Sequence, residues 1–489
     1  MATSADTLRS ILQLFLREGF QVTPKAAEFL SRSDNPFELA SNCLKTIRKI
    51  EPRPLAITVD LLLSNSKFKD VERKQIGLVE SAPEDWDFKS ADTQYMTHGI
   101  HPYPARMLPQ IAERLIKRYL LAQTQKPPGE LLVLDPFCGS GTVLAESKRL
   151  GLNSIGNDIN PLALLLAKVK STRVDETEFR QGVSRAVEAI DRALVKARRG
   201  QLRVDTPDIP NVKHWFKDDV IRDLVAIQCH LLETRDPVLR DFLKVCFSLT
   251  AFETSNIDLR SSRFIRVFSK DKLRRHRPDV AKTFREVAID ISKRLISFST
   301  YCFGENFSQV VWGDARSLPL KDSSIDLVVT SPPYGEERNT IGYTRWSKLS
   351  LYWLNFKSSL INVLEKASLG GKHAPLDTDS ETANEVLKKV EKIDPERAAE
   401  AAPFFIDYLD CLKELERVQK KDSYCCIVIG NRLIKRIPVD MGQVTVELGE
   451  KVGFSHVKTY YRKIPKKMIP WSGPTGKTIA SENIVILKM

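Results

Sequence analysis

The sequence predicts an α/β protein built on a doubly wound, mostly parallel sheet. Two short apolar segments, 131–135 and 154–158, look like strands, and each is followed by a helical pattern, over 142–150 and 161–170. Such strand–helix alternation places helices on both faces of a parallel sheet. Further strand-like segments follow after long helical stretches, at 309–312, 325–330 and 424–430.

The rest of the chain is predicted to be mainly helical. Residues 1–50 carry apolar side chains at helical spacing and form a small N-terminal helical module, which a connector over 51–91 joins to the main domain, 92–489. Helical insertions at about 175–300 and 347–421 interrupt the main domain, and the polar stretch 370–397 within the second is expected to be a mobile loop. Residues 453–489 are expected to supply one or two strands that close the sheet.

Composition restricts the class of protein. The 489 residues are 42% hydrophobic and 28% charged, which is typical of a folded globular chain and not of a disordered one. No apolar run approaches the ~18 residues of a membrane-spanning helix, and residues 1–20 lack the features of a secretory signal. The eight cysteines include no Cys-x-x-Cys pair, so we expect neither a disulfide framework nor a bound metal, and a cytoplasmic location.

A glycine-containing turn, residues 135–142 (Asp-Pro-Phe-Cys-Gly-Ser-Gly-Thr), joins the first strand to the first helix. Glycines allow the backbone to approach a ligand closely, and the start of the helix offers free N–H groups. Asp158, at the end of the next strand, is placed to bind ribose hydroxyls. A dinucleotide-binding loop would require a third glycine where Leu144 stands, so that alternative is weaker, and a turn without a ligand is the remaining one.

The string 135–142 resembles motif I of the S-adenosylmethionine-dependent amino-methyltransferases that act on nucleic acid bases. The resemblance implies a Rossmann-like methyltransferase fold with S-adenosylmethionine as cofactor, and places Asp158 at its ribose. It also implies that Asp314, just after a strand, binds the adenine amino group, although an aspartate that caps a turn is the alternative. The residues implied at the methionine side of the cofactor are Asp135, Phe137, Gly139, Gly141 and Thr142.

A proline corner, residues 331–335 (Ser-Pro-Pro-Tyr-Gly), follows the apolar strand 325–330. Two prolines make the corner rigid and remove two backbone donors, which leaves the Ser331 hydroxyl and the Pro332 carbonyl as acceptors. An exocyclic amine of a base is a poor nucleophile because its lone pair is delocalised into the ring. Two acceptors that bind its N–H groups draw the nitrogen toward tetrahedral geometry, while Tyr334 can stack on a base flipped out of the duplex.

The corner resembles motif IV of DNA amino-methyltransferases, in which serine at the first position favours cytosine N4 and aspartate favours adenine N6. The resemblance implies a catalytic role for Ser331, Pro332, Pro333 and Tyr334; a proline-stiffened loop without chemistry is the alternative. No Pro-Cys pair exists in the chain, so cytosine C5 methylation has no candidate nucleophile, and Cys138 is expected to serve in packing.

Residues 99–107 (Gly-Ile-His-Pro-Tyr-Pro-Ala-Arg-Met) resemble motif X, which packs against the methionine end of the cofactor. His101 is therefore a candidate cofactor contact, with a structural histidine in a turn as the alternative. Segments after the proline corner and near the C-terminus resemble later blocks of the family. The resemblance covers about 92–489, with the motif order X, I, IV.

Basic side chains are concentrated in two segments. Residues 260–277 hold eight Lys or Arg against one acid and residues 457–481 hold six against none, which accounts for the whole formal net charge of +13. Both segments are predicted to bind DNA phosphates, and a solvated helical face is the alternative for the first. The candidate contacts are Lys458, Arg462, Lys463, Lys466, Lys467, Arg263, Arg266 and Arg274.

The predicted function is site-specific methylation of an exocyclic amino group of DNA, with cytosine N4 ahead of adenine N6. The resemblance also implies a restriction–modification or defence setting and a possible cognate restriction partner. Two alternatives stay open. One is an RNA enzyme, because tRNA guanine-N2 methyltransferases share the proline corner, usually with Asn or Asp in place of Ser331. The other is a non-catalytic DNA-binding subunit on a methyltransferase scaffold.

Overall fold

A computed structural model describes residues 85–203, 205, 207–258, 267–302, 304–336, 342–370, 376–464 and 481–489 of the chain. The predicted N-terminal module and nearly all of the connector lie outside these residues. The chain divides into two compact units. The second, Trp86–Ile116 and Lys126–Met489, holds the sheet and the site described below, whereas Lys117–Gln125 belongs to the first.

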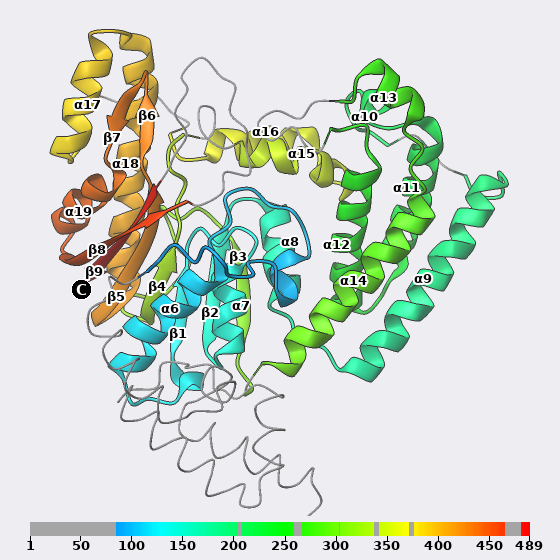
Figure 1. Cartoon of the computed structure of the whole chain (residues 1–489), viewed down its shortest axis with the longest axis horizontal. Helices are drawn as coiled ribbons and strands as arrows, with labels where there is room; N and C mark the ends of the chain where they lie inside the picture. The colour runs from blue at the N-terminus through cyan, green and yellow to red at the C-terminus, as the bar shows by residue number, and fades with distance from the viewer. Residues whose placement is uncertain are drawn as a thin grey trace, which may run out of the picture. The chain divides into compact units, whose positions relative to one another are not determined.

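Among the described residues, seven strands form one sheet in the order β3-β2-β1-β4-β5-β9-β8 (Figure 1). The neighbouring strands from β3 through β2, β1 and β4 to β5 pair in parallel, whereas β9 is antiparallel to both of its neighbours, β5 and β8. This confirms the predicted doubly wound, mostly parallel sheet. The strand bounds are β1 Leu132–Asp135, β2 Asn153–Asp158, β3 Ser308–Trp312, β4 Ile325–Thr330, β5 Gln419–Gly430, β8 Ser455–Lys463 and β9 Ser481–Lys488, and a small separate ribbon pairs β6 Arg432–Ile434 with β7 Ile437–Val439.

The central strands are apolar because helices cover both faces of the sheet. In β4, Ile325, Leu327, Val328 and Val329 are fully buried. Parallel strands buried on both faces favour continuous apolar runs over alternation. In the register of the sheet, Leu134 pairs with both β2 and β4, so the carboxyl ends of β1, β2 and β4 meet at one edge. Strand order reverses between β1 and β4, and ligands of such sheets bind outside this point.

Short helices connect the strands around this edge. Helix α7 (Thr142–Arg149) follows β1, and α8 (Pro161–Lys170) follows β2. Asn160 caps α8 by accepting the N–H of Leu162 at 3.1 Å, and Pro161 occupies the first helical position. Two further helices of the sheet domain are α6 (Pro109–Tyr119) and α19 (Met441–Lys451), and the 3-10 turns are Met96–Gly99, Leu121–Gln123 and Pro128–Glu130.

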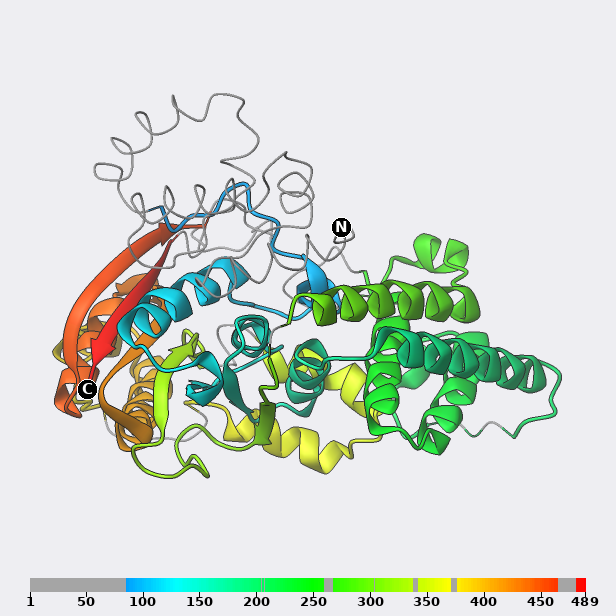
Figure 2. The ribbon, with the colours of Figure 1, turned by 90° about the horizontal axis from the view of Figure 1, so that it is seen from below.

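After α8, the described part of the chain holds six more helices before β3, in the predicted first insertion. They gather on the side of the sheet away from β8 and β9 (Figures 1 and 2). Aspartates Asp175, Asp236 and Asp279 cap three of them at their N-termini. The helices are α9 Glu176–Arg198, α10 Val212–Trp215, α11 Asp218–Glu233, α12 Pro237–Thr254, α13 Lys270–Arg275 and α14 Val280–Thr300.

The region between β4 and β5 is also helical, and it corrects one prediction. Its helices are α15 Tyr343–Trp353, α16 Ser358–Ala367, α17 Glu381–Glu391 and α18 Pro395–Val418. The expected mobile loop over 370–397 is wrong for most of its length, because α17 and the start of α18 fill it. Ser380 caps α17 by accepting the Ala383 N–H, and Ala383, Val386, Leu387 and Val390 bury one face of an otherwise polar helix.

None of the helices within the described ranges is both long and apolar enough to cross a membrane.

Candidate active site

A cavity lies at the carboxyl edge of β1, β2, β3 and β4, where the cofactor loop and the proline corner meet. A third wall comes from Tyr103–Met107, in the segment before α6. Most of the predicted catalytic and cofactor-binding residues line this cavity, namely Asp135, Phe137, Gly139, Thr142, Asp158, Asp314, Ser331 and Pro333. Gly141, Pro332, Tyr334 and His101 lie outside its wall.

The two loop glycines serve different purposes. Both have the positive φ that favours glycine, 47° at Gly139 and 81° at Gly141. The Gly139 N–H donates to a carboxylate oxygen of Asp158 at 2.9 Å, which joins the loop to the end of β2 inside the cavity. At Gly141, a Cβ atom would stand only 2.5 Å from the Cα of Ala167, so this glycine permits close packing of α8 behind the loop.

Asp135 presents a buried carboxyl group at the end of β1. It accepts hydrogen bonds from the Thr330 hydroxyl at 2.7 Å and the Phe137 N–H at 3.2 Å. Burial raises the pKa of Asp135 to about 7, and the nearby Asp158 charge adds to this effect. A buried carboxyl group that faces a cavity in this way is suited to a cationic ligand group, which would favour its charged form.

Two basic side chains, those of Arg106 and Lys170, lie near the cofactor loop. Arg106 lines the cavity and donates to the backbone carbonyl of His98. Lys170, only 1% exposed, donates to the Ser140 hydroxyl at 3.0 Å. Burial lowers the pKa of both groups. Within the described ranges neither forms an ion pair with a carboxylate. The Arg106 guanidinium keeps its charge and can bind an anionic ligand group at the cavity, whereas burial favours the neutral amine of Lys170.

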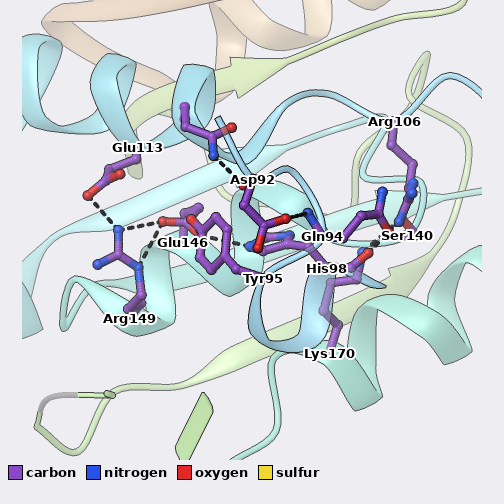
Figure 3. Close-up of polar contacts among 11 residues, drawn as sticks. Asp92, Gln94, Tyr95, His98, Arg106, Glu113, Ser140, Glu146, Arg149 and Lys170 are labelled. Carbon is purple, nitrogen blue, oxygen red and sulfur yellow. Dashed lines mark hydrogen bonds and ion pairs between the residues drawn. The ribbon is translucent and has the colours of Figure 1, made fainter. Parts of the chain in front are cut away.

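A buried ion network holds the segment that carries Arg106 (Figure 3). Its centre is Glu146 of α7, which accepts the Tyr95 hydroxyl at 2.6 Å, bonds His98 Nε2 at 2.8 Å and pairs with Arg149 at 2.7 Å. Arg149 also pairs with Glu113 at 2.5 Å. Burial alone would raise the pKa of Glu146, but Arg149, His98 and Tyr95 outweigh it and hold the value at about 2. The network ties the segment before α6 to the helix that follows the cofactor loop.

His101 has a structural position in the same segment. Its ring bonds the carbonyl of Pro102 at 2.7 Å and the hydroxyl of Ser248 at 3.0 Å, and it does not line the cavity. Burial lowers its pKa to about 4. The structure therefore places Arg106, and not His101, at the cavity. Arg106 was not among the predicted cofactor contacts, although it is the one Lys or Arg in residues 99–107.

The proline corner is anchored through its tyrosine. Tyr334 donates its hydroxyl to Glu482 at 2.8 Å and lies 3.5 Å from the hydroxyl of Ser331. Burial, then the charge of Glu482, raises the pKa of Tyr334, so the hydroxyl stays protonated and remains a donor. The second oxygen of Glu482 pairs with Arg462 at 2.5 Å. Nothing in the sequence indicated Glu482, which stands at the start of β9, 148 residues away from Tyr334.

Related proteins were compared with this chain. It is 32% identical over 431 residues to the type II methyltransferase M.MvaI of Kocuria varians, with 82% of this chain and 93% of that protein covered. The family model described as DNA methylase matches residues 64–169. The chain belongs to the DNA amino-methyltransferase family. It is also similar to the type II methyltransferases M.BsoBI of Geobacillus stearothermophilus (24% identity, 61% of each chain) and M.MjaII of Methanocaldococcus jannaschii (38% over 96 residues, 19% of this chain and 17% of the other).

S-adenosylmethionine is the methyl donor of this methyltransferase. The cavity suits it, because the cofactor carries an ammonium, a carboxylate, ribose hydroxyls and an adenine amine. The cavity lining supplies a matching set of groups: the buried carboxyl group of Asp135, the guanidinium of Arg106 and the carboxylates of Asp158 and Asp314. Asp314 is itself held by Arg316, whose guanidinium donates to it at 2.6 Å and pairs with Asp407 at 2.8 Å.

The structure divides the predicted DNA contacts of the methyltransferase. Arg462 is only 6% exposed and its guanidinium is paired with Glu482, so in this structure it does not face solvent. Lys458 and Lys463 are exposed on the edge strand β8, and Arg274 is exposed on α13. The remaining candidates, Arg263, Arg266, Lys466 and Lys467, lie outside the described residues.

Proposed function

We propose that this methyltransferase transfers the methyl group of S-adenosylmethionine to N4 of cytosine within a specific DNA sequence. One observation carries the proposal: the Ser331 hydroxyl lines the same cavity as the cofactor loop, at the position where family members that prefer adenine N6 favour an aspartate. A restriction enzyme that recognises the same sequence is the partner that this function implies.

The cofactor-binding residues follow from the lining of the cavity. Asp135 would bind the ammonium of the methionine part and Arg106 its carboxylate. Phe137, Gly139 and Thr142 would line the same end, and Gly141 would shape the loop from behind. Asp158 would bind the ribose hydroxyls and Asp314 the adenine amine. The bound cofactor supplies a methyl group on a positively charged sulfur, which needs no further activation.

The chemistry assigned to the protein concerns the amine of the base. The Ser331 hydroxyl and the Pro332 carbonyl accept its two N–H groups, so the lone pair is withdrawn from the ring and points toward the methyl group. The nitrogen takes the methyl group with S-adenosylhomocysteine as the leaving group, and the methylated amine, still hydrogen-bonded to these acceptors, then releases one proton to water. Pro333 keeps the corner rigid, and Tyr334 supports a base that has left the duplex.

The substrate can be tested directly. Purified enzyme is incubated with methyl-labelled S-adenosylmethionine and either double-stranded DNA or RNA, and the nucleosides are separated after digestion. We expect label in N4-methylcytosine from DNA. Label in N6-methyladenine would contradict the assigned base, label only in RNA would contradict the assigned nucleic acid, and cofactor binding without any transfer would indicate a non-catalytic subunit.

Cofactor affinity should depend on pH through Asp135. The ammonium binds the charged carboxylate, and the pKa of Asp135 is about 7 without ligand, so affinity should fall about tenfold per pH unit as pH drops below 7. The pKa of His101 is lowered to about 4, so this histidine titrates well below pH 7, and burial lowers the pKa of His98 as well. Calorimetry with S-adenosylhomocysteine measures the effect. Asp135→Asn should bind weakly and without this pH dependence; an unchanged pH profile in the variant would rule out Asp135 as its source.

The Arg106→Gln variant should lose affinity for the carboxylate of the cofactor. A hydrogen bond between charged groups contributes about 1.5–3 kcal/mol, so we expect a loss of roughly 10- to 100-fold for S-adenosylhomocysteine. Methylthioadenosine lacks the carboxylate and serves as the control ligand, and its affinity should stay unchanged. An equal loss for both ligands would show that Arg106 acts on the fold of the cavity and not on the carboxylate.

A further inference from the structure

A buried cluster of three charged side chains lies directly behind the proline corner. Glu336, which follows Gly335, is only 4% exposed and pairs with two guanidinium groups, those of Arg397 and Arg432. The contact with Arg432 measures 2.6 Å. Arg397 comes from the first turn of α18 and Arg432 from the start of β6, so the cluster joins three segments that are far apart in the sequence. Burial alone would raise the pKa of Glu336, but the two arginines lower it.

Gly335 shows how closely Arg432 approaches the backbone of the corner. A Cβ atom built on Gly335 would overlap Nη1 and Cζ of Arg432 and would lie 2.9 Å from Nε, so the guanidinium occupies the place of a side chain. The φ angle of Gly335 is not positive, and the glycine is therefore required for this close approach and not for its backbone conformation. Arg432 is itself buried, with its Cζ 5.5 Å from the ring centroid of Phe404.

The other parts of the corner are anchored as well. At its start, the Thr330 hydroxyl donates to Asp135, and in its middle Tyr334 donates to Glu482. The charged cluster adds an anchor directly after Tyr334, on the same short segment as the carbonyl of Pro332 and the hydroxyl of Ser331. The prolines stiffen the corner internally, but they do not fix its orientation relative to the cavity.

We propose that Glu336, Arg397 and Arg432 are positioning residues for methyl transfer, with the Arg432 guanidinium serving as the surface against which the backbone of Gly335 is held. The inference rests on the catalytic role proposed for the corner and is independent of which base is methylated. None of the three residues lines the cavity within the described part of the chain, so they act through the corner and not on the substrate.

The test uses two substitutions. Gly335→Ala adds a methyl group that overlaps the Arg432 guanidinium, and Arg432→Ala then removes that guanidinium. Gly335→Ala should lower kcat by about 10²-fold, because a displacement of about 1 Å in an active site has an effect of this size. The affinity for S-adenosylhomocysteine should stay the same. In the double variant with Arg432→Ala the overlap is gone, so kcat should be no lower than in Gly335→Ala alone. Multiplied losses in the double variant would contradict the proposal, as would a wild-type kcat in Gly335→Ala.

Two controls separate this inference from a general loss of folding and from the proposed function. Arg397 also contacts Glu400 at 3.4 Å, and Glu400→Gln, which alters an arginine contact outside the cluster, should leave kcat unchanged. Unchanged S-adenosylhomocysteine binding shows that each variant is folded. If the Arg432→Ala enzyme does not bind S-adenosylhomocysteine, Arg432→Lys is used in its place. Lysine keeps the charge but not the planar guanidinium, so this variant should have a lower kcat and an unchanged affinity for S-adenosylhomocysteine. A wild-type enzyme without activity refutes the proposed function, whereas an active wild type with a fully active Gly335→Ala refutes only the positioning role.

Discussion

Replacement of Ser331 by alanine is expected to reduce kcat for methyl transfer by about 10²-fold or more, while the affinity for S-adenosylhomocysteine remains at the wild-type level. The hydroxyl is one of two acceptors proposed to withdraw the amine lone pair from the ring, and removal of a single preorganised polar group at a reacting centre costs about 10²- to 10³-fold. The cofactor contacts assigned to Asp135, Arg106 and Asp158 stay intact. Single-turnover transfer of labelled methyl groups to DNA measures the effect.

Ser324→Ala is the matched control for this variant. Ser324 precedes the same strand, β4, at its opposite end, and its hydroxyl donates to the carbonyl of Lys321. Its loss should leave kcat unchanged. A Ser331→Ala enzyme with the wild-type kcat would refute the role assigned to the hydroxyl, and a loss of cofactor affinity in that variant would mean that Ser331 shapes the cavity.

Replacement of Glu146 by alanine should have the largest effect on stability, about 3–5 kcal/mol in the free energy of unfolding. Breaking a buried ion pair by removing one partner leaves the other charge buried, which costs this amount. Arg149 keeps Glu113, but the Tyr95 hydroxyl and the ring of His98 lose the acceptor that holds them. Urea unfolding without cofactor measures the change. Because the network fixes the segment that carries Arg106, cofactor affinity should also fall.

The exposed Glu188 of α9 provides the comparison. Its carboxylate lies 4.0 Å from Arg192 with both side chains largely in solvent, so Glu188→Ala should change stability by less than about 0.5 kcal/mol. If the two alanine variants unfold at the same urea concentration, the Glu146 network does not stabilise the fold.

The fold and the location of the site were predictable because they depend on local patterns. The glycine turn after β1 and the double proline after β4 each follow an apolar strand, and parallel strands end at a common edge. Asp135, Asp158 and Ser331 all stand at or directly after predicted strands, and in the structure they line one cavity at this edge. Helix α17 was missed because its buried face consists of only four apolar residues within a strongly polar segment.

Contacts between distant segments were not predictable in this way. Arg432 and Glu336, or Tyr334 and Glu482, meet only because β5 pairs with β4 and β9 pairs with β5 in the sheet, and no spacing in the sequence marks these pairs. Charge alone also does not indicate which way a side chain points. Arg462 belongs to a run of basic residues, yet the pleat of β8 turns its side chain inward to Glu482 while Lys463 points to solvent.

The central claim, methyl transfer to an exocyclic amine of DNA, is tested most directly by modified-base sequencing of DNA from cells that express the gene. The wild-type enzyme should place N4-methylcytosine at every copy of one short sequence, and cells that express Ser331→Ala should lack it. DNA without any methylated exocyclic amine in cells that contain the folded wild-type enzyme, or with methyl groups only at cytosine C5, would contradict the account.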